Sequence, residues 1–241
     1  MIERRRFRRI IFKEPIDAEV EYNNEKINIK ITNIGEKGFE FICDKKSLSI
    51  NNMIITKILD KYSNYDPFIS KISWVRETEK KVTCGTEFTK YSDNNLELLE
   101  KIFVDNGKKL FAFKKIVYIG DTNLEGNVYF AKYVDWQGMA REELWRKSYP
   151  LDFLKEKIIL ITVEAHISYK YPLFLYDEVL IFVNTSNIKK TTFDLVFSYV
   201  NKNNGKLIAE GTQTIGFSDF NGKFLPVPDS VVKEAQLFLI K

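Results

Sequence analysis

Residues 121–130 read Asp121-Thr122-Asn123-Leu124-Glu125-Gly126-Asn127-Val128-Tyr129-Phe130, a turn-rich loop that runs directly into a helical pattern. Apolar residues recur at three- and four-residue spacing from about residue 128 to 146, which predicts a helix there. A strand is expected before the loop, at 111–119. Polar and apolar residues then alternate in four long segments, at 158–171, 177–186, 190–201 and 206–217. One long helix followed by an antiparallel sheet predicts an α+β fold in which the sheet wraps the helix.

The first half of the chain has a different pattern, typical of a small antiparallel β-barrel. Short segments alternate with period two, at 18–22, 27–31, 39–41, 69–75 and 82–88. Ser92 is a good N-cap for a helix that ends at Asn106-Gly107. We therefore expect two domains, at 1–107 and 108–241.

Length and composition fit two packed domains. The chain has 241 residues, 44% of them hydrophobic, and no apolar run approaches the roughly 20 residues that a membrane-spanning helix needs. The N-terminus lacks the apolar core of a signal peptide. Cys43 and Cys84 show no metal-ligand spacing, so we expect two reduced buried thiols, no metal, no cofactor, no membrane partner and a cytoplasmic location.

Positive charge is distributed unevenly along the chain. A net charge of +4 is too small to indicate a nucleic-acid polymer as partner, but five of the eight arginines lie between Arg4 and Arg9. Arginine grips phosphate with a planar, two-pronged fork, which lysine does not offer. This cluster indicates a phosphate-bearing ligand.

The loop and helix of the second half resemble hotdog-fold thioesterases of the 4-hydroxybenzoyl-CoA type. The resemblance rests on residues 121–130, on Tyr133, Trp136, Ala140 and Arg141, and on later stretches such as Tyr171-Pro172-Leu173 and Gly211-Thr212-Gln213. It covers about 130 residues. It implies a hotdog fold and hydrolysis of acyl thioesters.

One departure from the common pattern points to a subfamily. Common members carry a catalytic aspartate where this chain has Asn123, and an amide cannot act as nucleophile or general base. Thioesterases of enediyne polyketide pathways share the asparagine, and in them the asparagine and a helix arginine are the proposed catalytic pair. These roles map onto Asn123 and Arg141. The resemblance further implies that the Phe130 N–H contacts the thioester carbonyl, and it assigns substrate binding to Asp121, Tyr129 and Tyr133.

Alternatives to these roles remain open at this stage. Arg141 lies on the mostly apolar side of the helix. Instead of a catalytic role, it could form a structural salt bridge or extend its charged end to solvent from an apolar surface. Asn123 is also a common turn residue, and Asp121 is a competing candidate for the base. The one histidine, His166, falls on the polar side of a strand and is expected to be solvated.

The start of the chain resembles a PilZ domain, in which Arg-x-x-x-Arg binds cyclic di-GMP. Arg5 and Arg9 match this motif best. The second PilZ element, Asp/Asn-x-Ser-x-x-Gly, corresponds to Asn33 through Gly38, with Gly35 in place of the serine. The resemblance implies nucleotide binding by Arg5, Arg9, Asn33 and Gly38. The alternative is a degenerate PilZ fold that serves as a structural or docking module.

Two hypotheses about function follow. The first is an acyl-CoA or acyl-carrier-protein thioesterase, with β-ketoacyl groups as a suitable substrate class, regulated by cyclic di-GMP. The second is a non-enzymatic cyclic di-GMP effector whose hotdog half dimerises or binds acyl groups. Because a single hotdog sheet leaves edge strands open, we expect at least a homodimer, or a homotetramer.

Overall fold

The computed structural model describes residues 7–44, 48–79, 81–149, 155 and 157–240. The chain divides into two compact units. One contains residues 9–106 and Lys202–Lys206. The other contains Phe7 and Arg8 and the described residues of 107–201 and 207–240. Arg5 lies outside the described residues.

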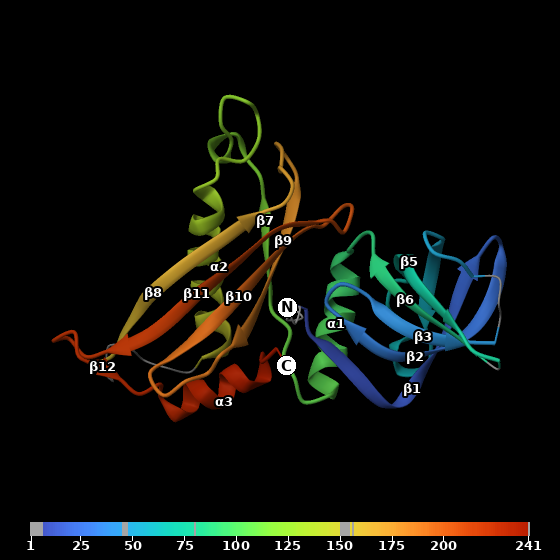
Figure 1. The fold of residues 1–241 in the computed structure, drawn as a ribbon, viewed down its shortest axis with the longest axis horizontal. Coiled ribbons are helices and arrows are strands. Elements are labelled where there is room, and N and C mark those ends of the chain that lie inside the picture. Colours follow the sequence, from blue (N-terminus) through green and yellow to red (C-terminus); the bar gives the residue numbers. More distant parts are fainter. Residues whose placement is uncertain (1–6, 45–47, 80, 150–154, 156, 241) are drawn as a thin grey trace. The chain divides into compact units, whose positions relative to one another are not determined.

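The first unit is a closed six-stranded antiparallel barrel (Figure 1). Its strands follow the order β1-β2-β3-β6-β5-β4. Their bounds are Arg9–Tyr22 (β1), Glu25–Gly35 (β2), Phe39–Cys43 (β3), Met53–Ile58 (β4), Phe68–Glu77 (β5) and Val82–Phe88 (β6). Cys43 and Cys84 are buried free thiols, as expected.

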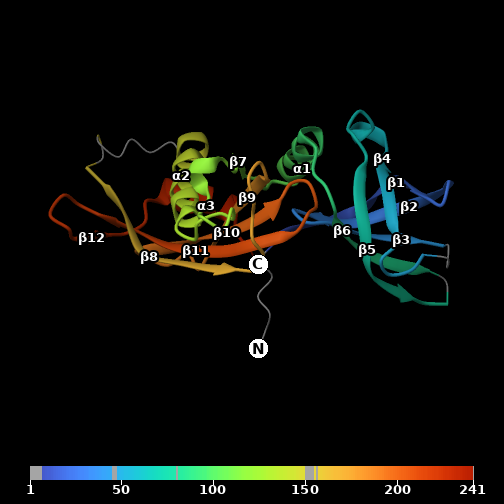
Figure 2. The same ribbon diagram turned by 90° about the horizontal axis from the view of Figure 1, so that it is seen from above.

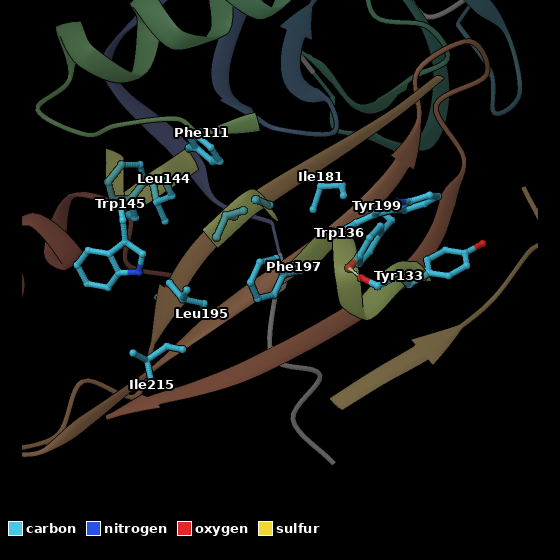
Figure 3. Close-up of a cluster of buried hydrophobic side chains, with 14 of the residues drawn as sticks. Phe111, Tyr133, Trp136, Leu144, Trp145, Ile181, Leu195, Phe197, Tyr199 and Ile215 are labelled. Carbon is cyan, nitrogen blue, oxygen red and sulfur yellow. Dashed lines mark hydrogen bonds between the residues drawn. The ribbon is translucent and has the colours of Figure 1, made fainter. Parts of the chain in front are cut away.

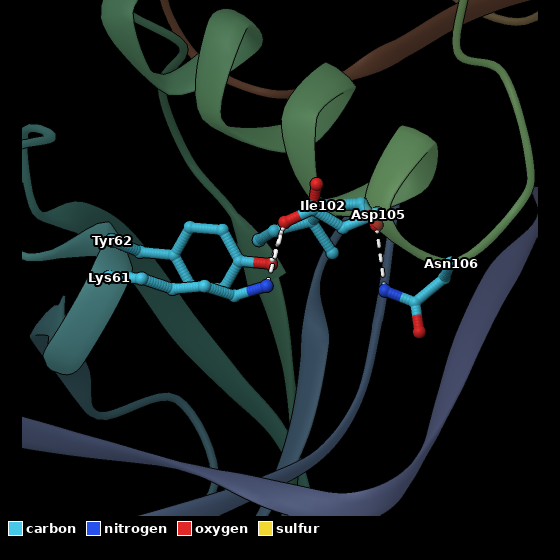
Figure 4. Close-up of polar contacts among 5 residues, drawn as sticks. All are labelled: Lys61, Tyr62, Ile102, Asp105 and Asn106. Atoms are coloured by element: carbon cyan, nitrogen blue, oxygen red, sulfur yellow. Dashed lines mark hydrogen bonds and ion pairs between the residues drawn. The ribbon is translucent and has the colours of Figure 1, made fainter.

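A helix follows the barrel strands, α1 (Asp93–Asp105). Its N-cap is Ser92, which accepts a hydrogen bond from the Asn95 N–H in a capping box, as the sequence predicted. Near its C-terminal end, Asp105 accepts hydrogen bonds from Lys61 (2.8 Å) and Tyr62 (2.9 Å) of the 3-10 turn η1 (Asp60–Tyr62) (Figure 4). These contacts tie α1 to the barrel.

The second unit is a curved antiparallel sheet with the long helix α2 (Lys132–Ser148) on one face (Figures 1 and 2). The order is β12-β11-β10-β9-β7, and β8 pairs with β11. The strand bounds are Ala112–Ile116 (β7), Ile159–Tyr169 (β8), Glu178–Ser186 (β9), Thr192–Asn201 (β10), Leu207–Ser218 (β11) and Phe224–Leu225 (β12). The 3-10 turn η2 (Ile119–Asp121) and the helix α3 (Asp229–Leu237) complete it.

The core of this unit lies between α2 and the concave face of the sheet (Figure 3). Trp136, Ala140 and Leu144 of α2 are almost fully buried against Leu195 and Phe197 of β10. A helix that buries one stripe against a sheet is the layer arrangement that the pattern predicted.

Several expected bounds were wrong. The helix begins at Lys132 and not near residue 128, because Val128 and Asn127 form β-bridges with Thr122 and Phe174. Strand β4 was missed because Met53, Ile54 and Ile55 are consecutive apolar residues that hide its alternation. The two-residue strand β12 and the nine-residue helix α3 were also missed, because both are too short for a clear period.

Of the helices in the described part of the chain, none combines the length and apolar character needed to span a membrane. Within the same residues, histidine, cysteine and acidic side chains form no group of three or more that could hold a metal ion.

Candidate active site

Asp121 holds the start of the loop that leads to α2. Its Oδ2 accepts a hydrogen bond from the Tyr118 N–H (2.9 Å) and lies 2.9 Å from Lys115 Nζ. Burial by itself raises the pKa of Asp121, but the Tyr118 hydrogen bond and the Lys115 ammonium outweigh burial, so the pKa is lowered. Asp121 as a whole residue is 8% exposed. Its contacts are those of a group that fixes the loop.

Asn123 folds the loop back on itself. Its Nδ2 donates to Asn127 Oδ1 (2.9 Å), and its Oδ1 accepts from the Glu125 N–H (3.0 Å). A side-chain amide has two donor hydrogens and two acceptor positions. One N–H and one lone pair of Asn123 therefore remain for another partner.

The backbone at Phe130 is open to a ligand. In the described residues, the Phe130 N–H has no hydrogen-bond acceptor, whereas the adjacent Tyr129 N–H donates to Asp121 O (2.9 Å). Helix α2 begins just after it, and the N-cap residue Ala131 supplies no side-chain cap. The helix dipole and unpaired N–H groups at such an end stabilise negative charge. Tyr169 OH donates to Phe130 O (2.9 Å) and so fixes this peptide.

The two candidate tyrosines lie in different surroundings. Tyr129 is exposed, and its ring centroid lies 4.6 Å from that of Phe130. Tyr133 is 3% exposed and packs edge-on against Tyr199 (Figure 3). It also packs edge-on against Tyr169. Burial raises the pKa of Tyr133 to about 12, so the phenol stays neutral at physiological pH.

Arg141 lies in the middle of α2, and its guanidinium is held through one nitrogen, Nη1. Nη1 donates to Thr162 Oγ1 (2.5 Å) and to Gln213 Oε1 (3.3 Å). Nε is buried without a hydrogen-bond partner, and Nη2 has none in the described part of the chain. No carboxylate there pairs with Arg141. A structural salt bridge, the alternative that the sequence left open, is therefore not found among the described residues.

The structure brings Asp121, Asn123 and Phe130 together in one loop, but it places Arg141 away from them along the helix. Arg141 lies nine residues beyond Lys132, the first residue of α2. That distance along the sequence corresponds to a rise of about 14 Å. The hydrogen-bond partners of Asn123 all lie in the loop, whereas those of Arg141 lie on β8 and β11.

Sequence reasoning did not assign roles to Thr162, Gln137 and Gln213, which lie around or beneath Arg141. The available signal was polarity in an apolar pattern, because Gln137 falls on the apolar stripe of the helix. His166 was expected to be solvated, and it is exposed on β8.

In the barrel, three of the four expected nucleotide ligands lie close together. Arg9 of β1 pairs with Gly35 of β2. Two positions further along the same two strands, Ile11 pairs with Asn33. Arg9 is exposed, and Asn33 is 9% exposed with its Oδ1 buried and unpaired. Gly38 closes the turn by accepting a hydrogen bond from the Gly35 N–H (2.8 Å).

Gly38 also has a packing role. A Cβ at Gly38 would lie 2.0 Å from the backbone oxygen of Thr86, so only glycine fits there. The turn itself is formed with glycine in place of serine at position 35, because the Gly35 N–H donates to Gly38 O (2.8 Å).

Arg8, although part of the arginine run, faces another environment from Arg9. Its guanidinium donates to Leu237 O (2.8 Å) and Lys109 O (2.5 Å) and lies 5.7 Å from the ring centroid of Phe238. It is 6% exposed. Arg8 is thus a packed structural residue of the second unit.

Comparisons with known proteins agree with the two folds. Residues 117–235 match the thioesterase-like superfamily, and residues 3–104 match the PilZ domain. No curated protein matches the chain.

Among solved structures, the dynemicin thioesterase matches with a TM-score of 0.52 and 26% identity, over 55% of this chain and 99% of its own. A gentisyl-coenzyme A thioesterase matches with a TM-score of 0.46 and 27% identity, over 51% and 99%. A Staphylococcus aureus protein solved in complex with CoA matches with a TM-score of 0.50 and 15% identity, over 54% and 84%.

Proposed function

Because the chain joins a PilZ domain at residues 3–104 to a thioesterase-like hotdog domain at residues 117–235, we propose that it hydrolyses acyl thioesters and that cyclic di-GMP regulates this activity. The substrates are acyl groups on coenzyme A or on acyl carrier protein. The observation that carries the proposal is that Arg141 Nη2 has no hydrogen-bond acceptor in the described residues. Arg141 is only partly exposed, and no carboxylate among the described residues neutralises it, so its guanidinium is suited to an oxyanion.

The reaction is attack of water on the thioester carbonyl. The water oxygen bonds to the carbonyl carbon, the carbon–sulfur bond breaks, and the water proton passes to the leaving thiolate, so that the products are a carboxylic acid and a thiol. The Phe130 N–H binds the carbonyl oxygen, and Arg141 stabilises the negative charge that develops on it. Asn123 uses its remaining N–H and lone pair to position the water.

The substrate class follows from the absence of a strong base in this machinery. Asn123 cannot take a proton from water, and Asp121 is already committed to Tyr118 and Lys115. The carbonyl must then be electrophilic without help. β-Ketoacyl thioesters meet this requirement, so we propose them as preferred substrates.

A second copy of the chain completes the site. One thioester carbonyl cannot contact both the Phe130 N–H and Arg141 of the same chain, because about 14 Å of helix separates them. Strand β8, which pairs only with β11 among the described strands, exposes Val163 and Tyr169. We propose a homodimer, or a homotetramer built from it, in which Arg141 of one copy faces the loop of the other.

In the PilZ domain, we propose that Arg5 and Arg9 bind the phosphates of cyclic di-GMP through charge-assisted contacts. Asn33 supports this proposal because it lies on β2, the strand that pairs with Arg9 of β1, and its Oδ1 has no hydrogen-bond partner in the described residues and can accept a hydrogen bond from a guanine base.

A second candidate is a non-enzymatic effector that binds acyl groups. It is favoured by one observation, that the Asn123 amide is used at both ends inside its own loop, as a purely structural turn residue would be.

Thiol release from a panel of CoA and carrier-protein thioesters, with and without cyclic di-GMP, distinguishes the two. The thioesterase proposal expects multiple turnovers and a change in rate on adding the nucleotide. Binding of acyl-CoA without any thiol release would favour the effector.

A further inference from the structure

Beneath Arg141 lies a row of buried amides between α2 and the sheet. Gln137 is one helical turn before Arg141 and is fully buried, and Gln213 of β11 is 3% exposed. Gln213 Nε2 donates to Gln137 Oε1 (3.1 Å), and Gln213 Oε1 accepts from Arg141 Nη1 (3.3 Å). Two side-chain amides thus connect the core to the arginine.

The orientation of both amides is set from one end of the row. Gln137 Nε2 donates to the backbone oxygen of His166 (3.3 Å), so Gln137 Oε1 must point toward Gln213. Gln213 then turns its Nε2 to Gln137 and its Oε1 to Arg141. A flip of either amide would set a donor against a donor or an acceptor against an acceptor. The sheet therefore delivers an oxygen, and not an N–H, to Arg141.

Neighbouring positions are fitted to this row. A Cβ at Gly211 would lie 2.0 Å from Gln137 Nε2, so the strand residue opposite the amide must be glycine. Burial of amides is unfavourable compared with aliphatic side chains that would pack the same helix against the same sheet. The hydrogen bonds of Gln137 and Gln213 therefore fix the orientation of these side chains between α2 and the sheet, which apolar side chains would not do.

The groups that accept hydrogen bonds from Arg141 carry no charge. Both acceptors of Arg141 Nη1, Gln213 Oε1 and Thr162 Oγ1, are neutral. A carboxylate in their place would also hold the guanidinium, but it would neutralise the positive charge. It would also tend to accept two hydrogen bonds from the guanidinium and so occupy two of its nitrogens. Neutral acceptors hold Nη1 without neutralising the guanidinium, and Nη2 has no acceptor in the described residues, so the positive charge remains available at Nη2.

We infer that Gln213, oriented by Gln137, is a positioning residue that holds Arg141 Nη1 through a neutral acceptor and so directs Nη2 at the substrate. This inference rests on the proposed role of Arg141 in thioester hydrolysis.

The test is a double-mutant cycle in the full-length chain with the best acyl-CoA of the panel as substrate. Gln213→Leu should lower kcat by about 10- to 100-fold with little change in KM, because the guanidinium loses its orientation. In the Arg141→Ala background, the same substitution should change kcat by less than about twofold, since a residue that acts through Arg141 has nothing left to position. Equal loss in both backgrounds, or wild-type kcat in folded Gln213→Leu, would overturn the inference.

Two further variants keep the test decisive. Gln213→Glu retains the shape of the side chain but places a carboxylate on Nη1, so it should also lower kcat by at least about tenfold in a folded protein; wild-type kcat in this variant would argue against positioning. Thr214→Val is the matched control, because Thr214 is the next residue of β11 and donates to Asp194 Oδ1 (2.8 Å), away from Arg141. Its kcat should equal that of the wild type.

A spectroscopic readout separates this inference from the proposed function. The Nε–H resonance of Arg141, assigned with Arg141→Lys, should shift or broaden in Gln213→Leu and stay unchanged in Thr214→Val. If the wild type releases no thiol but this shift occurs, the proposed function fails and the positioning contact stands. If the wild type releases thiol and the resonance does not respond, the positioning role fails alone.

Discussion

Lys115 Nζ lies 2.9 Å from Asp121 Oδ2, and both side chains are largely enclosed. Asp121→Asn keeps the acceptor for the Tyr118 N–H but leaves the Lys115 charge without its partner. Breaking a buried ion pair costs about 3 kcal/mol or more, so we expect a loss near this size in the free energy of unfolding, measured by urea denaturation of the hotdog domain. A loss below about 0.5 kcal/mol would show that the pair does not hold the loop.

The same pair makes stability depend on pH. Because the pKa of Asp121 is lowered in the folded state, its contribution to stability is complete above the unfolded-state value of about 3.9 and is lost as the pH falls through the folded-state pKa. The wild type should therefore lose stability below about pH 4 more steeply than Asp121→Asn. Parallel urea-midpoint curves for the two proteins from pH 6 to 3 would contradict this.

Asn123→Asp tests whether the neighbourhood of this residue suits a general base. The aspartate keeps the acceptor for the Glu125 N–H but loses the donor to Asn127 Oδ1. The loop should persist, at a cost of about 1 kcal/mol, if the Asn127 amide turns its N–H groups inward. We expect turnover to be retained and to gain an acid limb in its pH–rate profile, since only the ionised carboxylate accepts a proton. Asn123→Ala should instead lower kcat at every pH.

Arg8 and Arg9 are adjacent in sequence but should respond differently to substitution by alanine. Arg8→Ala removes the donor to Leu237 O and Lys109 O, so it should destabilise the hotdog domain by about 1 to 3 kcal/mol with unchanged cyclic di-GMP affinity. Arg9→Ala should weaken nucleotide binding by about 1.5 to 3 kcal/mol with unchanged stability. Calorimetry and denaturation on both variants check this, and an absence of binding heat with the wild type would remove the ligand.

Mixing two inactive variants tests whether two copies build one site. If the loop of one chain meets Arg141 of another, coexpressed Asn123→Ala and Arg141→Ala chains should form mixed dimers in which one of the two sites is intact. Purified mixed dimers should then recover about half of the wild-type kcat. No recovery in dimers shown to be mixed would place both residues in one chain's site, and a monomer by light scattering would exclude the shared site.

The sequence predicted those parts that depend on local pattern. The start of α1 is recognisable from its N-cap residue Ser92, which forms the capping box. The loop before α2 is recognisable from Asn123 and Gly126. The contact of Arg141 with Thr162 could not be predicted from local pattern. It depends on the register of β8 against β11, which shifts between the pairs Glu164–Thr214 and Thr162–Ile215. A local shift of this kind is set by tertiary packing and leaves no period in the sequence.

The unpaired Phe130 N–H was likewise only partly predictable. A tight turn before a helix indicated open N–H groups, but the true helix start depends on the bridge from Asn127 to the distant Phe174 and on the bridge from Val128 to Thr122. Long-range pairing therefore decided which peptide is left open.

The central claim is that Arg141 stabilises the transition state of thioester hydrolysis and that Asp121 serves the fold. The most direct measurement is kcat for acyl-CoA hydrolysis by Arg141→Ala and by Asp121→Asn, compared with the wild type at a temperature where all three are folded. Arg141→Ala should lower kcat by about 10²- to 10³-fold, whereas kcat of Asp121→Asn should stay close to that of the wild type. Abolished turnover in folded Asp121→Asn together with retained turnover in Arg141→Ala would contradict it.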